Sequence, residues 1–79
     1  MWFIVLLMND RNLILKISQK IKEIRLSKSM TLDDLAAASN MDNSNIARLE
    51  SGNTNPTIRT LYKISLGLKV KLKDLVDVE

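Results

Sequence analysis

The chain of 79 residues contains no cysteine and no histidine. The lack of cysteine excludes disulfides, thiolate catalysis and sulfur-ligated metal sites. The lack of histidine removes the side chain that most often transfers protons near neutral pH. We therefore expect a protein that is not an enzyme and holds no cofactor. Since nothing here requires an oxidising compartment, we expect it to be cytoplasmic.

Long hydrophobic runs are also missing, because even the longest unbroken apolar run, which contains Trp2 to Met8, is short. A membrane helix needs about 20 apolar residues, and a signal peptide needs a basic start, so we expect no membrane partner. We treat residues 1–11 as an apolar N-terminal segment and expect a short strand, paired with its copy in a dimer. Periodicity does not distinguish this strand from a buried helical turn. Alternatively, Met8 is the natural start and the preceding residues are translated upstream of it.

Hydrophobic residues make up 46% of the chain and charged residues 27%, which is typical of a folded domain. A single hydrophobic core of this size rarely contributes more than about 3 to 5 kcal/mol to the stability of the fold. Small domains often gain further stability by sharing a core in a dimer. The net charge of +3 suits an anionic partner. Between residues 11 and 30 the only acid is Glu23, and this stretch is either a binding surface or the solvated face of a helix. Its cations are Arg11, Lys16, Lys20, Lys22, Arg25 and Lys28.

After residue 11 the hydrophobic spacing becomes helical. Ile14, Ile17, Ile21 and Ile24 recur at spacings of three and four, which predicts an amphipathic helix over residues 12–28. Four shorter helices follow, and residues typical of helix starts and ends bound the first three of them. These boundary pairs are Thr31 and Asn40, Asp42 and Gly52, and Thr57 and Gly67. The last helix is predicted from Lys71 to about Val76, and Lys71 replaces the hydroxyl residue that usually caps this helix in the family described below. The pattern predicts an all-α domain of five helices over residues 12–79.

The stretch from Thr31 to Gly52, TLDDLAAASNMDNSNIARLESG, closely resembles the helix-turn-helix of phage repressor and Cro-like (Xre-type) transcription regulators. The resemblance extends from about Ile17 to Val76 and implies a repressor-like DNA-binding fold. Ala36 stands where the two helices meet, and Asn40 stands at the tight turn between them. Chains of this length and type resemble prophage repressors and restriction-modification controller proteins.

By this resemblance, the helix from Asp42 to Glu50 enters the DNA major groove. Asn pairs well with adenine and Arg with guanine, so this helix has suitable chemistry. The residues expected to read bases are Asn43, Ser44, Asn45 and Arg48, whereas Asp42 is expected to cap the helix. A solvated or phosphate-bound amide is the alternative for Asn43, and a surface role near Glu50 or Asp42 is the alternative for Arg48. Phosphate contacts are expected from Thr31, Asn53, Thr54, Asn55, Thr57 and Arg59.

Arg25 and Glu50 correspond to a pair that joins the first and third helices in the family, so we expect both to be structural. The chain also departs from the family pattern. Leu32 replaces the usual Gln, which often braces a phosphate or a base-reading side chain, and Ser29 and Asn40 stand where Gly is frequent.

We expect two copies to pack through the fifth helix, using Val70, Leu72, Leu75 and Val76, with help from Trp2 to Leu7. Two recognition helices about 34 to 36 Å apart would then read an inverted-repeat operator. Regulation would be by repression, or by activation through contact with RNA polymerase. The alternative function is an antitoxin that neutralises a toxin partner through the apolar N-terminal segment and also binds its own promoter. Asp33 and Asp34 are better explained as acids favoured by a helix dipole than as a catalytic pair.

Overall fold

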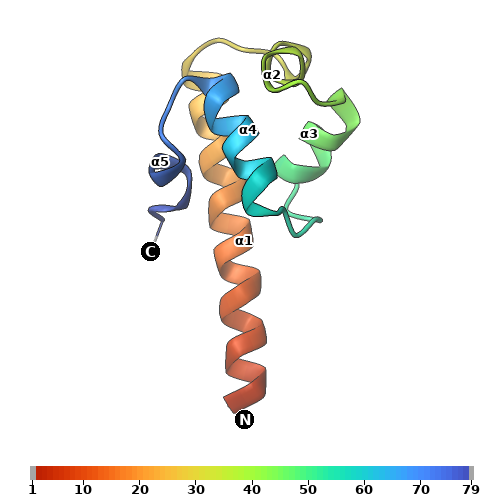
Figure 1. The fold of residues 1–79 in the computed structure, drawn as a ribbon. Helices are drawn as coiled ribbons and strands as arrows, with labels where there is room; N and C mark the ends of the chain where they lie inside the picture. The colour runs from red at the N-terminus through yellow and green to blue at the C-terminus, as the bar shows by residue number, and fades with distance from the viewer. Residues whose placement is uncertain (1, 79) are drawn as a thin grey trace.

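Five helices make up the part of the chain that the structure describes (Figure 1). The computed structural model describes the backbone of residues 2–78 and the side chains of residues 11–78. The helices are α1 (Trp2–Ser27), α2 (Leu32–Ser39), α3 (Asn43–Glu50), α4 (Ile58–Leu68) and α5 (Leu72–Val76). The all-helical prediction is confirmed. Within these residues, no helix is both long and apolar enough to cross a membrane.

The first helix is longer than predicted, because α1 begins at Trp2 rather than near residue 12. The strand predicted for residues 2–8 is therefore wrong. No glycine or proline precedes Gly52, so nothing interrupts the helix, and Leu and Met are good helix formers. The predicted boundary after residue 11 falls inside this helix, whose first turns project beyond the other helices (Figure 1). The side chains of Trp2 to Leu7, predicted to assist dimer or toxin contacts, lie outside the described residues.

A single core of aliphatic side chains joins all five helices. α2 packs against α3 and α4, whereas α1 packs against α3 and α5. The most buried positions include the predicted inward face of α1, which supplies Ile17 and Ile21. The remaining buried hydrophobic residues are Leu35, Ala36, Ile46, Leu49, Leu61, Ile64, Leu68 and Leu75.

Local hydrogen bonds fix both ends of α2, and its C-terminal end leads into the turn before α3. At its start, the Asp34 amide donates to Thr31 Oγ1 at 3.0 Å, and the Thr31 amide donates to Asp34 Oδ2 at 2.9 Å. At its end, Asn40 has φ 54°, a left-handed conformation that Asn tolerates well. The Met41 amide then donates to the carbonyl of Ala36 at 2.9 Å, which closes the turn. The predicted cap and the predicted turn residue are both confirmed.

Gly67 has a packing role rather than the predicted helix-ending role. α4 continues through Leu68, and the left-handed residue that ends it is Lys69, with φ 59°. A Cβ atom on Gly67 would lie 2.3 Å from Ser39 Oγ and 3.1 Å from the Ser39 backbone nitrogen. Gly67 therefore lets α4 approach the C-terminal end of α2 closely.

Candidate nucleic-acid interface

The α3 helix presents a polar edge to solvent because its apolar residues face inward. Ile46 is fully buried and Leu49 is 4% exposed, which anchors the helix on the core. The side chains on the other side are exposed, and they are the four predicted to read bases: Asn43, Ser44, Asn45 and Arg48. Their exposure is what base reading requires, and no part of the described chain covers them.

Asp42 occupies the predicted N-cap position of α3 but caps it differently from the prediction. Its backbone is extended, and its carbonyl accepts hydrogen bonds from the amides of Asn45 and Ile46 at 3.0 and 3.2 Å. Its carboxylate makes no capping hydrogen bond. The carboxylate is therefore an exposed negative charge at the helix N-terminus, where the helix dipole favours it.

Asn43 is held by a residue that the sequence did not suggest. Its Nδ2 donates a hydrogen bond to Asp33 Oδ1, which links the first residue of α3 to the first turn of α2. The neighbouring Leu32, which stands where the family usually has Gln, packs against the core instead. Asp33, one position after Leu32, therefore contacts a side chain that is predicted to read a base. Sequence spacing alone gave no signal for this pair.

The predicted phosphate-contacting residues differ in how free their polar groups are. Asn53, Asn55 and Arg59 are exposed. Thr31 and Thr57 use their hydroxyl oxygens as caps, accepting from Asp34 and Thr60 amides at 3.0 and 3.1 Å. Their phosphate contacts would therefore rely on the hydroxyl hydrogen or on nearby backbone amides.

Thr54 departs most clearly from its predicted role. Its Oγ1 is buried and finds no hydrogen-bond partner among the described residues, so this hydroxyl is not presented to a phosphate. The residue nevertheless lies in a shallow hollow of about 230 Å³ that also involves Arg48, Asn55 and Thr57. The fold thus places part of the loop predicted to contact phosphates beside the exposed polar edge of α3.

The early cations do not all belong to this surface. Lys16 and Lys20 line a hollow with Asp77 and Val78, between α1 and the C-terminal segment. This placement favours the solvated-face interpretation for these two lysines. Arg25 is also withdrawn from solvent, as predicted, because it is 7% exposed.

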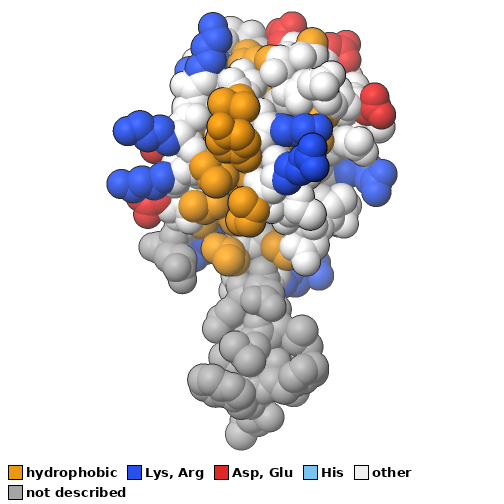
Figure 2. Space-filling view, in the orientation of Figure 1, with side chains coloured by type: hydrophobic (Ala, Val, Ile, Leu, Met, Phe, Trp, Pro, Cys, Tyr) orange, Lys and Arg blue, Asp and Glu red, His pale blue; other side chains and the backbone are white. Residues whose placement is uncertain are grey.

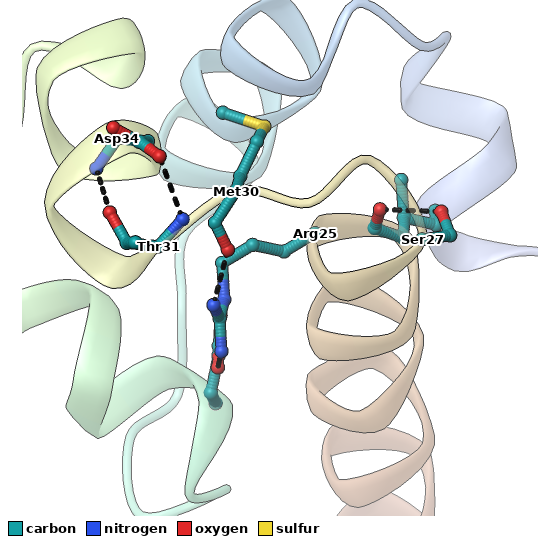
Figure 3. A network of polar contacts seen from close by, with 7 residues as sticks. Arg25, Ser27, Met30, Thr31 and Asp34 are labelled. Atoms are coloured by element: carbon teal, nitrogen blue, oxygen red, sulfur yellow. Dashed lines mark hydrogen bonds and ion pairs between the residues drawn. The ribbon is translucent and has the colours of Figure 1, made fainter.

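Arg25 joins three parts of the fold (Figure 3). Its Nε donates to Glu50 Oε2 at 2.6 Å, and its Nη2 donates to Glu50 Oε1 at 3.0 Å. Its Nη1 donates to the carbonyl of Met30 at 2.7 Å, in the turn before α2. The hydrogen bond to Glu50 raises the pKa of Arg25, although burial opposes this effect. The pair fixes the C-terminal end of α3 against α1 and supports the predicted structural role of both residues.

The predicted dimer surface on α5 is only partly available. Leu75 is fully buried in the core of its own chain, so its side chain offers no surface to a partner. Val70 and Leu72 are half-buried against the same core, and Val76 is 37% exposed. Burial of Leu75 reflects the packing of α5 against α1 and α4, which local sequence does not determine.

Among the residues whose side chains the structure describes, the main exposed apolar surface lies instead on α4. Ile58, Tyr62 and Leu66 recur every four residues and are 67%, 53% and 58% exposed; we call them the α4 band. Figure 2 shows hydrophobic side chains gathered over this face of the molecule. An adjoining apolar hollow of about 300 Å³ is lined by Leu13 and Val76, among others. The hydropathy pattern contained this stripe, but only the fold shows that it is left uncovered.

Known proteins resemble this chain in both sequence and fold. Residues 21–75 match the family model HTH_3, described as Helix-turn-helix. The control protein C.BamHI of Bacillus amyloliquefaciens is 39% identical over 67 residues, which are 84% of this chain and 83% of that protein. The restriction-modification controller protein C.AhdI from Aeromonas hydrophila has a TM-score of 0.76 at 26% identity, covering 78% of this chain and 94% of that one.

A further solved structure is that of the controller protein C.Esp1396I, a tetramer in complex with its natural 35 base-pair operator. It has a TM-score of 0.74 and 39% identity, and the match covers 80% of this chain and 93% of that one. The predicted resemblance is therefore confirmed by a family model that spans most of the chain and by relatives of similar length. The chain belongs to the HTH_3 (Xre-type) family of DNA-binding helix-turn-helix transcription regulators.

Proposed function

We propose that this protein regulates transcription by binding an inverted-repeat operator as a homodimer, with α3 in the major groove. The observation that carries the proposal is the exposed polar edge of α3, held outward by buried Ile46 and Leu49. A major groove about 12 Å wide accepts one helix in this manner. The operator-bound structure of C.Esp1396I, a relative of the same fold, supports the same use of the domain.

The chemistry of the edge suits direct base reading. Asn43 can form paired hydrogen bonds with adenine, and Arg48 can form them with guanine. Ser44 and Asn45 add side-chain groups that accept or donate hydrogen bonds. Contacts from Asn53, Asn55 and Arg59, together with the amides at the start of α4, would position the protein on the phosphates.

The α4 band supports self-association. Three large exposed apolar side chains beside an apolar hollow form a continuous surface that a soluble monomer seldom leaves bare. A second copy would cover the band with an identical band, as a twofold interface requires. Burial of this surface would also add to the limited core of a domain this small. The proposed interface therefore centres on α4 and includes Val76 from the surface predicted on α5.

The test is selection of bound sequences from random DNA by the purified full chain. We expect recovery of an inverted repeat whose half-sites are about 10 base pairs apart, or a multiple of that spacing. Binding to the selected site should weaken steeply as salt is raised, because phosphate contacts release counterions. Recovery of no common sequence, together with a flat salt response, would refute the proposal.

A further inference from the structure

We propose that Asp33 determines base specificity by holding the side-chain amide of Asn43, so that α3 accepts adenine and rejects guanine at one operator position. This inference rests on the proposed function, in which Asn43 faces a base. It adds a residue from α2, outside the recognition helix, to the set that decides which operator is bound.

The fold brings the two residues together across the turn of the helix-turn-helix. Asp33 lies in the first turn of α2, and Asn43 is the first residue of α3. Both side chains are exposed, and Asn43 Nδ2 donates to Asp33 Oδ1. Leu32 packs against the core, and the next residue on a helix points about 100° away, which turns Asp33 toward the surface. The contact is thus a consequence of how α2 is anchored.

The carboxylate determines which way the amide of Asn43 faces. An ionised carboxylate only accepts hydrogen bonds, so it selects the rotamer that turns the NH2 group toward it. The flipped amide would place two oxygens side by side without a hydrogen. After this bond is made, Asn43 keeps one free N–H donor and its Oδ1 acceptor.

This fixed arrangement matches only one purine. Adenine presents an acceptor at N7 and a donor at N6, which complement the free N–H and Oδ1 of Asn43. Guanine presents two acceptors, N7 and O6, so the fixed Oδ1 would face O6 with no hydrogen between them. We call the hydrogen bond between Asn43 and Asp33 the brace. An amide without the brace can turn its NH2 group toward guanine and remove this conflict. The brace therefore acts chiefly by excluding guanine.

A purely electrostatic role for Asp33 would have a different signature. A negative charge on this face repels phosphates of every DNA sequence alike, so its removal should strengthen binding to all sequences together. Loss of the brace should instead reduce the preference between two bases at one position. The ratio of affinities for two operators that differ at that position separates the two roles.

The experiment uses the full chain and the operator obtained by selection. The Asn43 position is first identified as the base pair whose preference disappears in Asn43→Ala. We expect Asp33→Ala to lower the adenine-over-guanine affinity ratio there by at least about five-fold, while affinity for random DNA is unchanged or higher. Asp33 is exposed in a first helical turn, and alanine is a strong helix former, so the variant should fold.

Asp42→Asn is the matched control. It removes one negative charge directly beside Asn43, from a carboxylate that makes no capping hydrogen bond, and Asn is an equally good N-cap. We expect it to leave the affinity ratio unchanged. A wild-type ratio in Asp33→Ala, or an equal loss in Asp42→Asn, would overturn the inference. If Asn43→Ala leaves every base preference intact, the assignment of Asn43 as a base reader fails instead.

Discussion

Arg25 and Glu50 tie α3 to α1 through two hydrogen bonds, of 2.6 and 3.0 Å. Their side chains are only 9% and 6% exposed, so both charges are largely removed from water. The orientation of α3 therefore depends on a pair outside its exposed polar edge, because Glu50 is the last residue of that helix. If α3 binds DNA as proposed, binding and stability are linked at this point of the fold.

Removing one member of this pair should unfold the domain. Arg25→Ala or Glu50→Ala leaves a buried charge without its partner, which costs about 3 to 5 kcal/mol, similar to the whole stability of a domain this small. Urea denaturation followed by circular dichroism measures the loss. The double variant Arg25→Met/Glu50→Leu, which removes both charges, should recover much of it. A loss below about 1 kcal/mol in each single variant would contradict the structural role.

Substitution on the edge of α3 should weaken specific binding without affecting the fold. Asn43→Ala and Arg48→Ala each remove side-chain groups able to pair with a base, which should cost about 1 to 3 kcal/mol of binding to the selected operator. Titrations with the operator and with random DNA measure the difference, and thermal unfolding checks the fold. An equal loss on both DNAs would show that these residues contact only the backbone.

Self-association should depend on the α4 band. Leu66→Glu places a charge where two copies would meet, so we expect a shift from dimer to monomer in sedimentation equilibrium. Because Leu66 is 58% exposed, the fold should survive. Leu26→Glu is a matched control, since Leu26 is 56% exposed but lies on α1 rather than on the band. A dimer that persists in Leu66→Glu but is lost in Leu26→Glu would place the interface elsewhere.

A methyl group at Gly67 should destabilise the contact between α2 and α4. Gly67→Ala forces its Cβ into Ser39, and such overpacking typically costs about 1 to 3 kcal/mol. Ser39→Ala should recover only part of this loss, because the Ser39 backbone nitrogen would still lie 3.1 Å from the added atom. Denaturant unfolding of the two single variants and the double variant gives the coupling free energy between positions 39 and 67. A stabilising effect of Gly67→Ala would contradict the close approach.

The cap of α2 should make stability fall in acid. Hydrogen bonds from the backbone amide and side chain of Thr31 lower the pKa of Asp34 below its ordinary value. A lowered folded-state pKa means that the contribution is fully present above the unfolded pKa, about 3.9, and is lost as pH falls through the folded value. The stability difference between wild type and Asp34→Asn should therefore be constant above about pH 5 and shrink below pH 4. A stability difference between the two proteins that grows in acid would contradict the lowered pKa of Asp34.

Much of the architecture follows from local chemistry. The helical spacing of Ile14, Ile17 and Ile21 predicted the inward face of α1, and Thr31 and Asn40 predicted where α2 begins and ends. Capping bonds and left-handed turns join residues only a few positions apart, so short stretches of sequence contain the whole signal. The same was true of the helix-turn-helix pattern, which the comparisons confirm.

The sequence by itself therefore determined the number of helices, most of their ends and the family. Only the tertiary structure decided which apolar residues stay exposed, since Leu75 is buried while Ile58, Tyr62 and Leu66 remain at the surface. It also decided that Asp33 meets Asn43 and that Gly67 meets Ser39. These contacts depend on which face of each helix packs against its neighbour. The spacing of residues within a single helix does not determine that packing.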